Sequence, residues 1–514
     1  MYRTTKKIHP GAEKFELPFG GKLYPGNRWV KLAQLIPWSE FESEYASQFS
    51  SSMGAPAKSF RMALGALIIK ERLGTSDEET VEQIKENPYL QYFLGLTEYT
   101  NVAPFEASML VHFRQRLNRE LVGRINERIV LNRKQTDRET NQAQQKEKTD
   151  GISTEEGEQP LLKNRGKLIV DATCTPADIS YPTDLKLLNQ AREYTEKILD
   201  KLYQQVKEKF ERKPRTYRIQ ARKNYLEVAK QRRPKKKKRR KAIGKQLAYL
   251  KRNLSHIDVL LIKGASLSQL SQHDYRMLLV VSELFRQQQL MYENRSSRID
   301  DRIVSLTQPH VRPLVRGKAG TNVEFGAKLS VSYSDGYCFL DHLSWDNFNE
   351  SLDLQFQIEQ YQQRFGHYPE SVHVDRIYPT RANRAFCKER GIRISAPPLG
   401  RPPAKPQPDV IKQRREDEKF RNAIEGKFGQ AKRRFSLNRI MAKLSDTAET
   451  TIAITFLVMN LELLLKQFFA RFFFFCPKSL SIKMVISASI RQANNFLTSF
   501  CQLTFLSSQL QALI

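Results

Sequence analysis

The second half of the chain has an order of strand and helix patterns that few folds can accommodate. A short apolar strand begins at Lys167 and reaches Asp171. After a long interruption, two further strands lie in VEFGAKLSVSYSDGYCFLDHLSW, with their turn marked by Ser334, Asp335 and Gly336. Three strands in this arrangement predict the start of a mixed sheet.

Helical and strand patterns then alternate. We predict a helix from Leu352 to Arg364, a strand ending at Asp375, a helix ending at Gly391, the short strand IRIS, and a long charged helix that carries Glu425. Strand, strand, strand, helix, strand, helix, strand, helix is the order of a ribonuclease H-like mixed sheet flanked by helices. We therefore predict this α/β fold, in which the first and fourth strands lie together.

The predicted fold would bring two aspartates into proximity, although Asp171 and Asp375 are 375 − 171 = 204 positions apart. Each follows an apolar run, as a partly buried strand would. A single aspartate at a strand end is often structural, but two carboxylates about 4 Å apart repel by roughly 4 kcal/mol at an effective dielectric near 20. A bound cation would relieve that repulsion.

A third carboxylate lies in RNAIEGKFGQAKRRF, where Arg421, Glu425 and Lys432 stand at i, i+4 and i+11 on one side of a helix. An ordinary Arg–Glu helix pair is the alternative interpretation. Carboxylates and water are the ligands that Mg²⁺ or Mn²⁺ prefers, whereas the scarcity of Cys and of close His pairs argues against zinc. Asp171, Asp375 and Glu425 are thus candidate catalytic and metal-binding residues for two divalent ions. Asp335, in a turn, and Asp341, on a more distant strand, compete for the second position.

The net charge indicates a polyanionic partner. Lys and Arg number 85 against 55 Asp and Glu, a formal charge of +30, and nucleic acid fits this excess better than a membrane does. A solvated basic surface is the alternative. The densest basic run lies in the interruption and supplies candidate DNA-binding residues: Arg232, Arg233, Lys235, Lys236, Lys237, Lys238, Arg239, Arg240 and Lys241.

Three further features bear on location. The five cysteines are widely spread and form no CxxC pair, which fits a reducing cytoplasm. The N-terminus shows no secretory signal pattern. The apolar stretch 452–475 is interrupted by charged residues, so we expect a buried helix and no membrane span.

Composition divides the chain into five predicted parts. They are a helical N-terminal domain (1–132), a polar linker (133–165), a ribonuclease H-like domain with the three candidate acids (166–183 and 318–470), a basic helical insertion (184–317) and an atypical tail (471–514). The tail follows four successive Phe, whose T-rich codons could permit a frame shift. We hypothesise that this tail is a non-native addition.

Several motifs resemble those of DDE-type transposases from bacterial insertion sequences. They are KLIVDATCTPADI, VEFGAKLSVS, VHVDRIYPTRANRAFCKERGIRISAPPLGRPP and RNAIEGKFGQAKRRFSLNRIMAKL, preceded by an N-terminal segment, RMALGALIIKERLGTSDEETVEQIKENPYLQYFLGL. The resemblance implies that Asp171, Asp375 and Glu425 form the metal-binding triad. It also implies that Arg421 and Lys432 contact phosphate as part of a Tyr-Arg-Glu-Lys signature. Here Glu418 stands in place of the tyrosine, for which Tyr378 is a weak substitute.

The resemblance further implies cleavage at the element's ends and attack of the released 3′-hydroxyl on target DNA. The expected partners are double-stranded DNA, as terminal inverted repeats and target, and a second copy of the chain in a homodimer. The expected location is the bacterial cytoplasm, at the nucleoid. A metal-dependent endonuclease without strand transfer and an inactive DNA-binding derivative are the alternatives.

Overall fold

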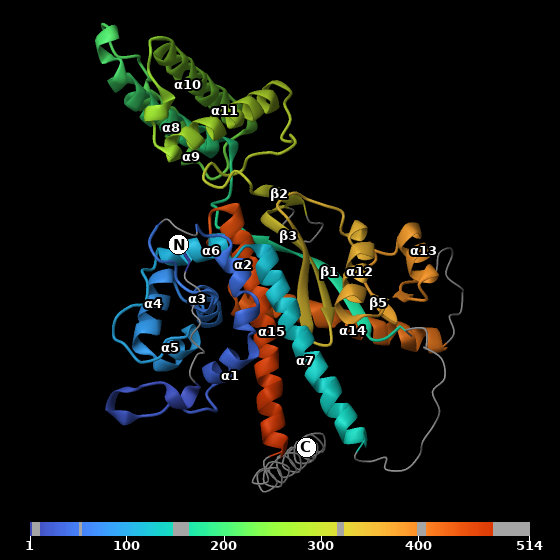
Figure 1. Ribbon diagram of the computed structural model, residues 1–514. Helices are drawn as coiled ribbons and strands as arrows, with labels where there is room; N and C mark the ends of the chain where they lie inside the picture. Colours follow the sequence, from blue (N-terminus) through green and yellow to red (C-terminus); the bar gives the residue numbers. More distant parts are fainter. Residues whose placement is uncertain (3–10, 51–53, 147–163, 316–322, 398–407, 476–514) are drawn as a thin grey trace, which may run out of the picture.

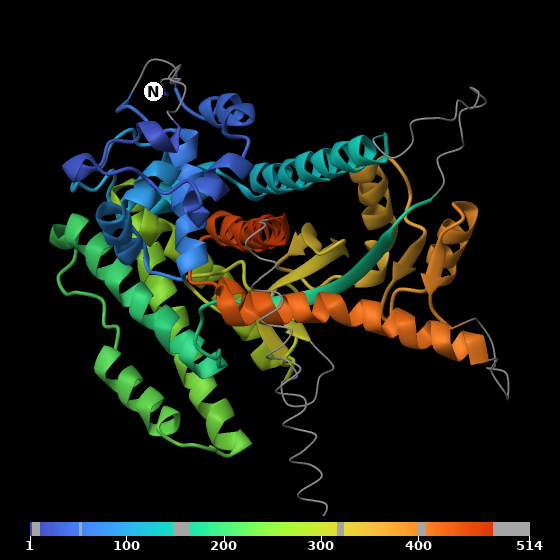
Figure 2. The ribbon, with the colours of Figure 1, turned by 90° about the horizontal axis from the view of Figure 1, so that it is seen from below.

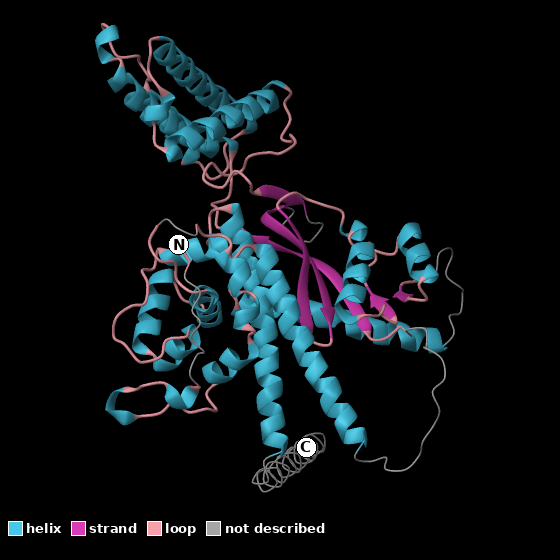
Figure 3. Ribbon diagram, viewed as in Figure 1, coloured by secondary structure: helices cyan, strands magenta, loops and turns pink. Residues whose placement is uncertain are grey.

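The computed structural model describes residues 1–2, 11–50, 54–146, 164–315, 323–397 and 408–475. Figures 1 and 3 show helical regions around one mixed sheet, with a helical insertion projecting from one end of it. The predicted α/β fold with a helical N-terminal region is confirmed.

The helices and strands follow the predicted order closely. The N-terminal region contains α1 (Arg28–Leu35), α2 (Glu42–Ala46), α3 (Phe60–Leu73), α4 (Asp77–Glu86), α5 (Pro88–Leu94), α6 (Met109–Arg116) and α7 (Arg119–Lys146). The insertion contains α8 (Asp184–Gln205), α9 (Arg218–Ala229), α10 (Lys236–Ile262) and α11 (Gln272–Glu293). The sheet region contains β1 (Lys167–Pro176), β2 (Arg312–Val315), β3 (Val323–Ser334), β4 (Tyr337–Ser344), α12 (Leu354–Phe365), β5 (Ser371–His373), α13 (Arg381–Glu389), β6 (Arg393–Ser395), α14 (Pro408–Arg434) and α15 (Ser445–Phe475). Short 3₁₀ helices connect them: η1 (Ala12–Lys14), η2 (Pro18–Gly20), η3 (Trp38–Glu40), η4 (Lys207–Lys209), η5 (Leu267–Gln269), η6 (Glu350–Leu352) and η7 (Ser436–Asn438).

The sheet joins the two strands that the sequence predicted to be neighbours. Its order is β2-β3-β1-β5-β6, and β4 pairs with β3 beside β2. β1 is antiparallel to β3 and parallel to β5, with Ile169 opposite His373. Two details differ from expectation. β2 is an additional strand, and β1 continues five residues past Asp171 to Pro176 because Thr173 and Cys174 are also buried and paired with β3.

The β3–β4 hairpin turns at the predicted position. Asp335 and Gly336 have φ angles of 53° and 94°, as a two-residue turn matched to the strand twist requires. Further along, β3 comes very close to β1. A Cβ on Gly326 would lie 2.0 Å from the Thr175 carbonyl oxygen, so only glycine fits at this crossing.

Helices cover the sheet on two sides. α7, α12 and α15 lie on one side and α14 runs along the other (Figure 2). The face of α14 toward the sheet carries Ile424, Phe428 and Ala431, whose i, i+4, i+7 spacing gives one apolar stripe. That contact fixes where Glu425 lies relative to β1.

The N-terminal helices share one hydrophobic core with the sheet. α15 packs against α1, α3, α6, α7 and β4, and Glu462 on α15 pairs with Arg72 of α3 and Arg434 of α14. Among the described residues, the Ser445–Ala470 part of α15 is long and apolar enough to cross a membrane, with mean hydropathy 1.6, but 72% of its apolar window is buried inside the protein. The predicted buried helix is therefore present.

The insertion has small cores of its own between α8, α9, α10 and α11. Of its candidate DNA-binding residues, Lys238 and Arg240 are half-buried and the other seven are exposed. Lys238 pairs with Glu227 at 3.4 Å, and Arg240 donates to the Tyr292 carbonyl at 2.8 Å. These two side chains thus also hold the insertion together.

The predicted boundaries remain predictions, with one observed difference. α7 continues through Lys146, so residues 133–146 of the expected linker are helical. Their Arg, Gln, Glu and Lys side chains suit a helix without needing a core. Residues 147–163 of the linker, and 476–514 of the tail, lie outside the described residues.

Candidate active site

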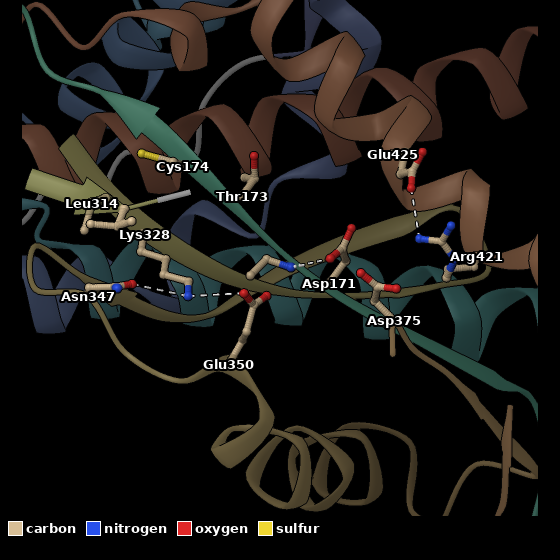
Figure 4. Close-up of a pocket in the computed structure, with 12 residues that line it drawn as sticks. Asp171, Thr173, Cys174, Leu314, Lys328, Asn347, Glu350, Asp375, Arg421 and Glu425 are labelled. Atoms are coloured by element: carbon tan, nitrogen blue, oxygen red, sulfur yellow. Dashed lines mark hydrogen bonds and ion pairs between the residues drawn. The ribbon is translucent and has the colours of Figure 1, made fainter. Parts of the chain in front are cut away.

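A hollow of about 330 Å³ lies where β1, the end of β5 and α14 meet (Figure 4). It contains the three predicted acids together with Arg421. Its full lining is Asp171, Ala172, Thr173, Cys174, Leu314, Val315, Lys328, Asn347, Glu350, Asp375, Arg421 and Glu425.

Sheet register explains why the two aspartates meet. Ile169 of β1 is opposite His373 of β5 in parallel pairing, and each aspartate lies two residues further along its strand. Asp171 is inside β1 and half-buried, whereas Asp375 follows β5 and is exposed. Adjacent strands are about 4.8 Å apart, so this register places both carboxylates at one edge of the hollow.

The electrostatics of Asp171 are unusual for a carboxylate. Its pKa is raised to about 6, mainly by burial and in addition by the charges of Glu350 and Asp375. The Ala172 N–H, which donates to Asp171 Oδ1 at 2.8 Å, and the Arg421 charge act in the opposite direction without cancelling the rise. Asp171 therefore has less donor and cation support than its ionised form needs.

Glu425 is paired with Arg421. The Arg421 Nη1 lies 2.9 Å from Glu425 Oε1, and the Glu425 side chain is 54% exposed. This is the ordinary helix pair named as the alternative above. Across the described residues, no three His, Cys, Asp or Glu side chains are close enough together to hold a metal ion. The three acids thus share a hollow without converging on one point.

Sequence reasoning missed Glu350, which lines the hollow together with Lys328. Glu350 is on η6 and Lys328 is on β3, and their charged atoms are 3.2 Å apart. The pattern around FNESLDL gave no signal for Glu350. With these two residues, the lining carries four acids and two bases, a formal charge of −4 + 2 = −2.

Other sequence candidates lie elsewhere. Lys432 is half-buried on α14 and does not line the hollow, and neither does any residue of the basic run. Tyr378 is fully buried and donates its hydroxyl to Glu350 Oε2 at 3.3 Å, so it is no surface substitute for the missing tyrosine. Asp341 is buried against Arg364, and exposed Asp335 pairs with Lys134. Neither competes for the second acid position.

Comparison with protein families finds two regions of similarity. A model described as a transposase DDE domain matches residues 372–462, which include Asp375 and Glu425. A transposase domain (DUF772) matches residues 19–116 in the N-terminal helices. The chain is therefore similar to transposases in these two regions. The resemblance to DDE-type transposases of insertion sequences is confirmed.

Similarity to transposase families indicates DNA transposition, nuclease or transposase chemistry and DNA binding only in general. DDE transposases use divalent metals as a family. A curated relative, "Uncharacterized protein ORF8 in nfe locus" of Rhizobium meliloti, is 29% identical over 167 residues, covering 32% of this chain and 70% of the relative. No solved structure matches the chain.

Proposed function

We propose that this DDE transposase cleaves DNA at the ends of its element and joins the released 3′-hydroxyl to target DNA. The observation that carries the proposal is the hollow of formal charge −2 on a chain of formal charge +30. A basic protein that lines one hollow with acids creates a place for cations on a surface suited to polyanions. Phosphodiester chemistry needs both.

The hollow supplies suitable donors for Mg²⁺ or Mn²⁺. Its carboxylate oxygens are the hard ligands that these ions prefer, and Asp171, Asp375 and Glu425 would hold two of them. Bound there, divalent cations would polarise the phosphodiester and stabilise the charge that develops during its displacement. Glu425 would first have to leave Arg421, its present partner.

Release of Glu425 would give Arg421 a second role. A guanidinium freed beside the acids can bind a DNA phosphate with two parallel hydrogen bonds. Lys432 lies about two helical turns beyond Glu425 on the same side of α14, and it would bind the next phosphate.

The surface of α14 near Glu425 is open enough for such contacts. Among the described residues, a Cβ on Gly426 would meet no atom within 4 Å, and one on Gly429 would approach only Arg433. These glycines are therefore not explained by close packing on the sheet. Absence of side chains here leaves room for a DNA backbone to approach α14 closely.

Residues outside the hollow would also bind DNA. The exposed Lys and Arg of the run 232–241 would contact phosphates without reading sequence, while the N-terminal helices would bind the terminal inverted repeats. Joining two ends needs two copies, so a homodimer on DNA is part of the proposal. The proposed location is the bacterial cytoplasm, at the nucleoid.

The test uses a labelled duplex that contains an element end, incubated with the full chain and Mg²⁺ or Mn²⁺. Nicking followed by joining to a second duplex is expected, and both should vanish on chelation. Nicking without joining would favour the endonuclease alternative. Cleavage unchanged in Asp171→Asn and in Glu425→Gln would overturn the assignment of the hollow.

A further inference from the structure

The hollow contains a fourth carboxylate, to which the resemblance to DDE-type transposases gives no role. We propose that Glu350 is an additional ligand of the cation site and that the Lys328 ammonium neutralises it until cations arrive. This rests on the proposed function, because it concerns how the same hollow accepts its ions. Two side chains far apart in the sequence, on β3 and η6, carry the inference.

Lys328 is held firmly at the wall of the hollow. Its Nζ donates to the Phe348 carbonyl at 2.7 Å, lies 3.2 Å from Glu350 Oε1, and sits 4.8 Å from the centre of the Phe348 ring. The side chain is only 16% exposed. A lysine so enclosed is positioned by its partners, since an ordinary surface lysine keeps its ammonium in water.

Glu350 is held in place by a buried neighbour. Tyr378, which is fully buried, donates its hydroxyl to Glu350 Oε2 at 3.3 Å. Burial and the Glu350 charge raise the pKa of Tyr378 above its usual range, so the hydroxyl remains a donor at neutral pH. Glu350 thus has one oxygen facing Lys328 and the other facing Tyr378.

Glu350 also acts on the site electrostatically. Its charge, like that of Asp375, raises the pKa of Asp171. Figure 4 shows Glu350 with Lys328 at one end of the hollow and Glu425 with Arg421 at the other, with Asp171 and Asp375 between them. Each glutamate is paired with a basic side chain, while the two aspartates have no lysine or arginine within ion-pair distance among the described residues.

This arrangement indicates how charge would change on ion binding. Two divalent cations would take the formal charge of the lining from −2 to −2 + 4 = +2. The Lys328 ammonium and the Arg421 guanidinium would then be repelled from the hollow and become available to DNA phosphates. Each glutamate would then bind a metal ion in place of its lysine or arginine partner.

The test measures cation binding without DNA and without catalysis. The full chain is titrated with Mn²⁺, and free Mn²⁺ is followed by electron paramagnetic resonance. Glu350→Gln should weaken Mn²⁺ binding by about tenfold or more. Lys328→Met should strengthen it severalfold, because the competing ammonium is gone. Thermal unfolding of each variant checks that it is folded.

Glu359→Gln is the matched control. Glu359 likewise accepts from a tyrosine hydroxyl, that of Tyr368 at 3.1 Å, and pairs with Arg390 at 3.3 Å, but it lies outside the hollow. Its substitution should leave Mn²⁺ binding within twofold of the native chain. Unchanged binding in Glu350→Gln, or weaker binding in a folded Lys328→Met, would overturn the inference.

Asp171→Asn separates this inference from the proposed function. If Asp171→Asn weakens Mn²⁺ binding and Glu350→Gln does not, only the role of Glu350 fails. If neither variant changes binding, the hollow is not a cation site and the proposed function fails with it. Loss of binding in both supports both.

Discussion

Two groups of acids in the sheet region differ in the hydrogen-bond donors and cations that surround their carboxylates. Beneath α7 and α12, the Asp341 side chain is fully buried, yet Arg364 binds it at 2.7 Å and Gln357 donates to its other oxygen at 2.9 Å. Arg364 also pairs with Glu127 at 2.7 Å. In the hollow beside α14, Asp171 has one backbone donor and a raised pKa.

The difference teaches which buried acid serves structure and which is available for chemistry. Asp341 has a donor for each oxygen, and the charges of Asp341 and Glu127 raise the pKa of Arg364 despite its burial. Asp171 instead faces further negative charges. An acid whose donors are supplied by the fold has no need of a ligand, whereas an acid short of donors does.

The largest effect is expected on the free energy of unfolding, from a substitution that breaks the ion pairs of Arg364. Arg364→Met would leave Asp341 and Glu127 without their cation, and removing one partner of a buried pair costs about 3–5 kcal/mol. Denaturant unfolding of the sheet region measures the loss. Arg390→Met, which removes a more exposed pair with Glu359, should cost at most about 1 kcal/mol. Equal losses in the two variants would contradict the comparison.

The next largest effect is expected on nicking activity, from a substitution of Asp171 in the hollow. Asp171→Asn should reduce Mg²⁺-dependent nicking by at least about 100-fold, equivalent to about 2.7 kcal/mol in the barrier, because a cation ligand is lost. Unfolding free energy at pH 7 should stay equal or rise, since an unsupported charge is removed. A variant that unfolds as readily as Arg364→Met would show that Asp171 is structural.

The pH dependence of stability should differ between Asp171 and its amide. The folded pKa of Asp171 is about 6, above the ordinary 3.8, because of burial and of Glu350 and Asp375, opposed by Arg421. The folded state therefore binds the proton more tightly, and the stability that this gives at low pH is lost as pH rises from about 4 to 6. In chelator, the native chain should lose about 2 kcal/mol relative to Asp171→Asn across that window. Parallel pH curves would contradict this.

The smallest effect per residue is expected on the salt dependence of DNA binding, from substitutions in the basic insertion. Replacing exposed Lys235, Lys236 and Lys237 by Gln should lower the slope of log affinity against log salt by up to about 2.7, at about 0.9 per phosphate contact. Fluorescence anisotropy between about 50 and 200 mM salt measures it. Arg240→Gln is the control, since Arg240 is tied to Tyr292, and it should leave the slope nearly unchanged.

Local sequence patterns were enough to predict most elements of the sheet region. Apolar spacing predicted α12, α13 and β6 within a few residues, and Gly74 ends α3 in the left-handed conformation that glycine adopts readily. The order of elements also predicted that β1 and β5 are neighbours. Such features depend on short-range periodicity and on chain connectivity, both of which are present in a linear sequence.

Only the tertiary structure decided which acids are unsupported. Nothing in the local sequence distinguishes Asp341 from Asp171, because the distinction depends on Arg364 and Gln357 arriving from α12. Lys328 and Glu350 form an ion pair although they are 350 − 328 = 22 positions apart in the sequence. The N-terminal helices share the core of the sheet because they pack against α15. The sequence by itself determined the elements and the approximate place of Asp171, Asp375 and Glu425. Side-chain packing between distant segments set the donors and charges around each acid, because solvation and pairing depend on neighbours in space.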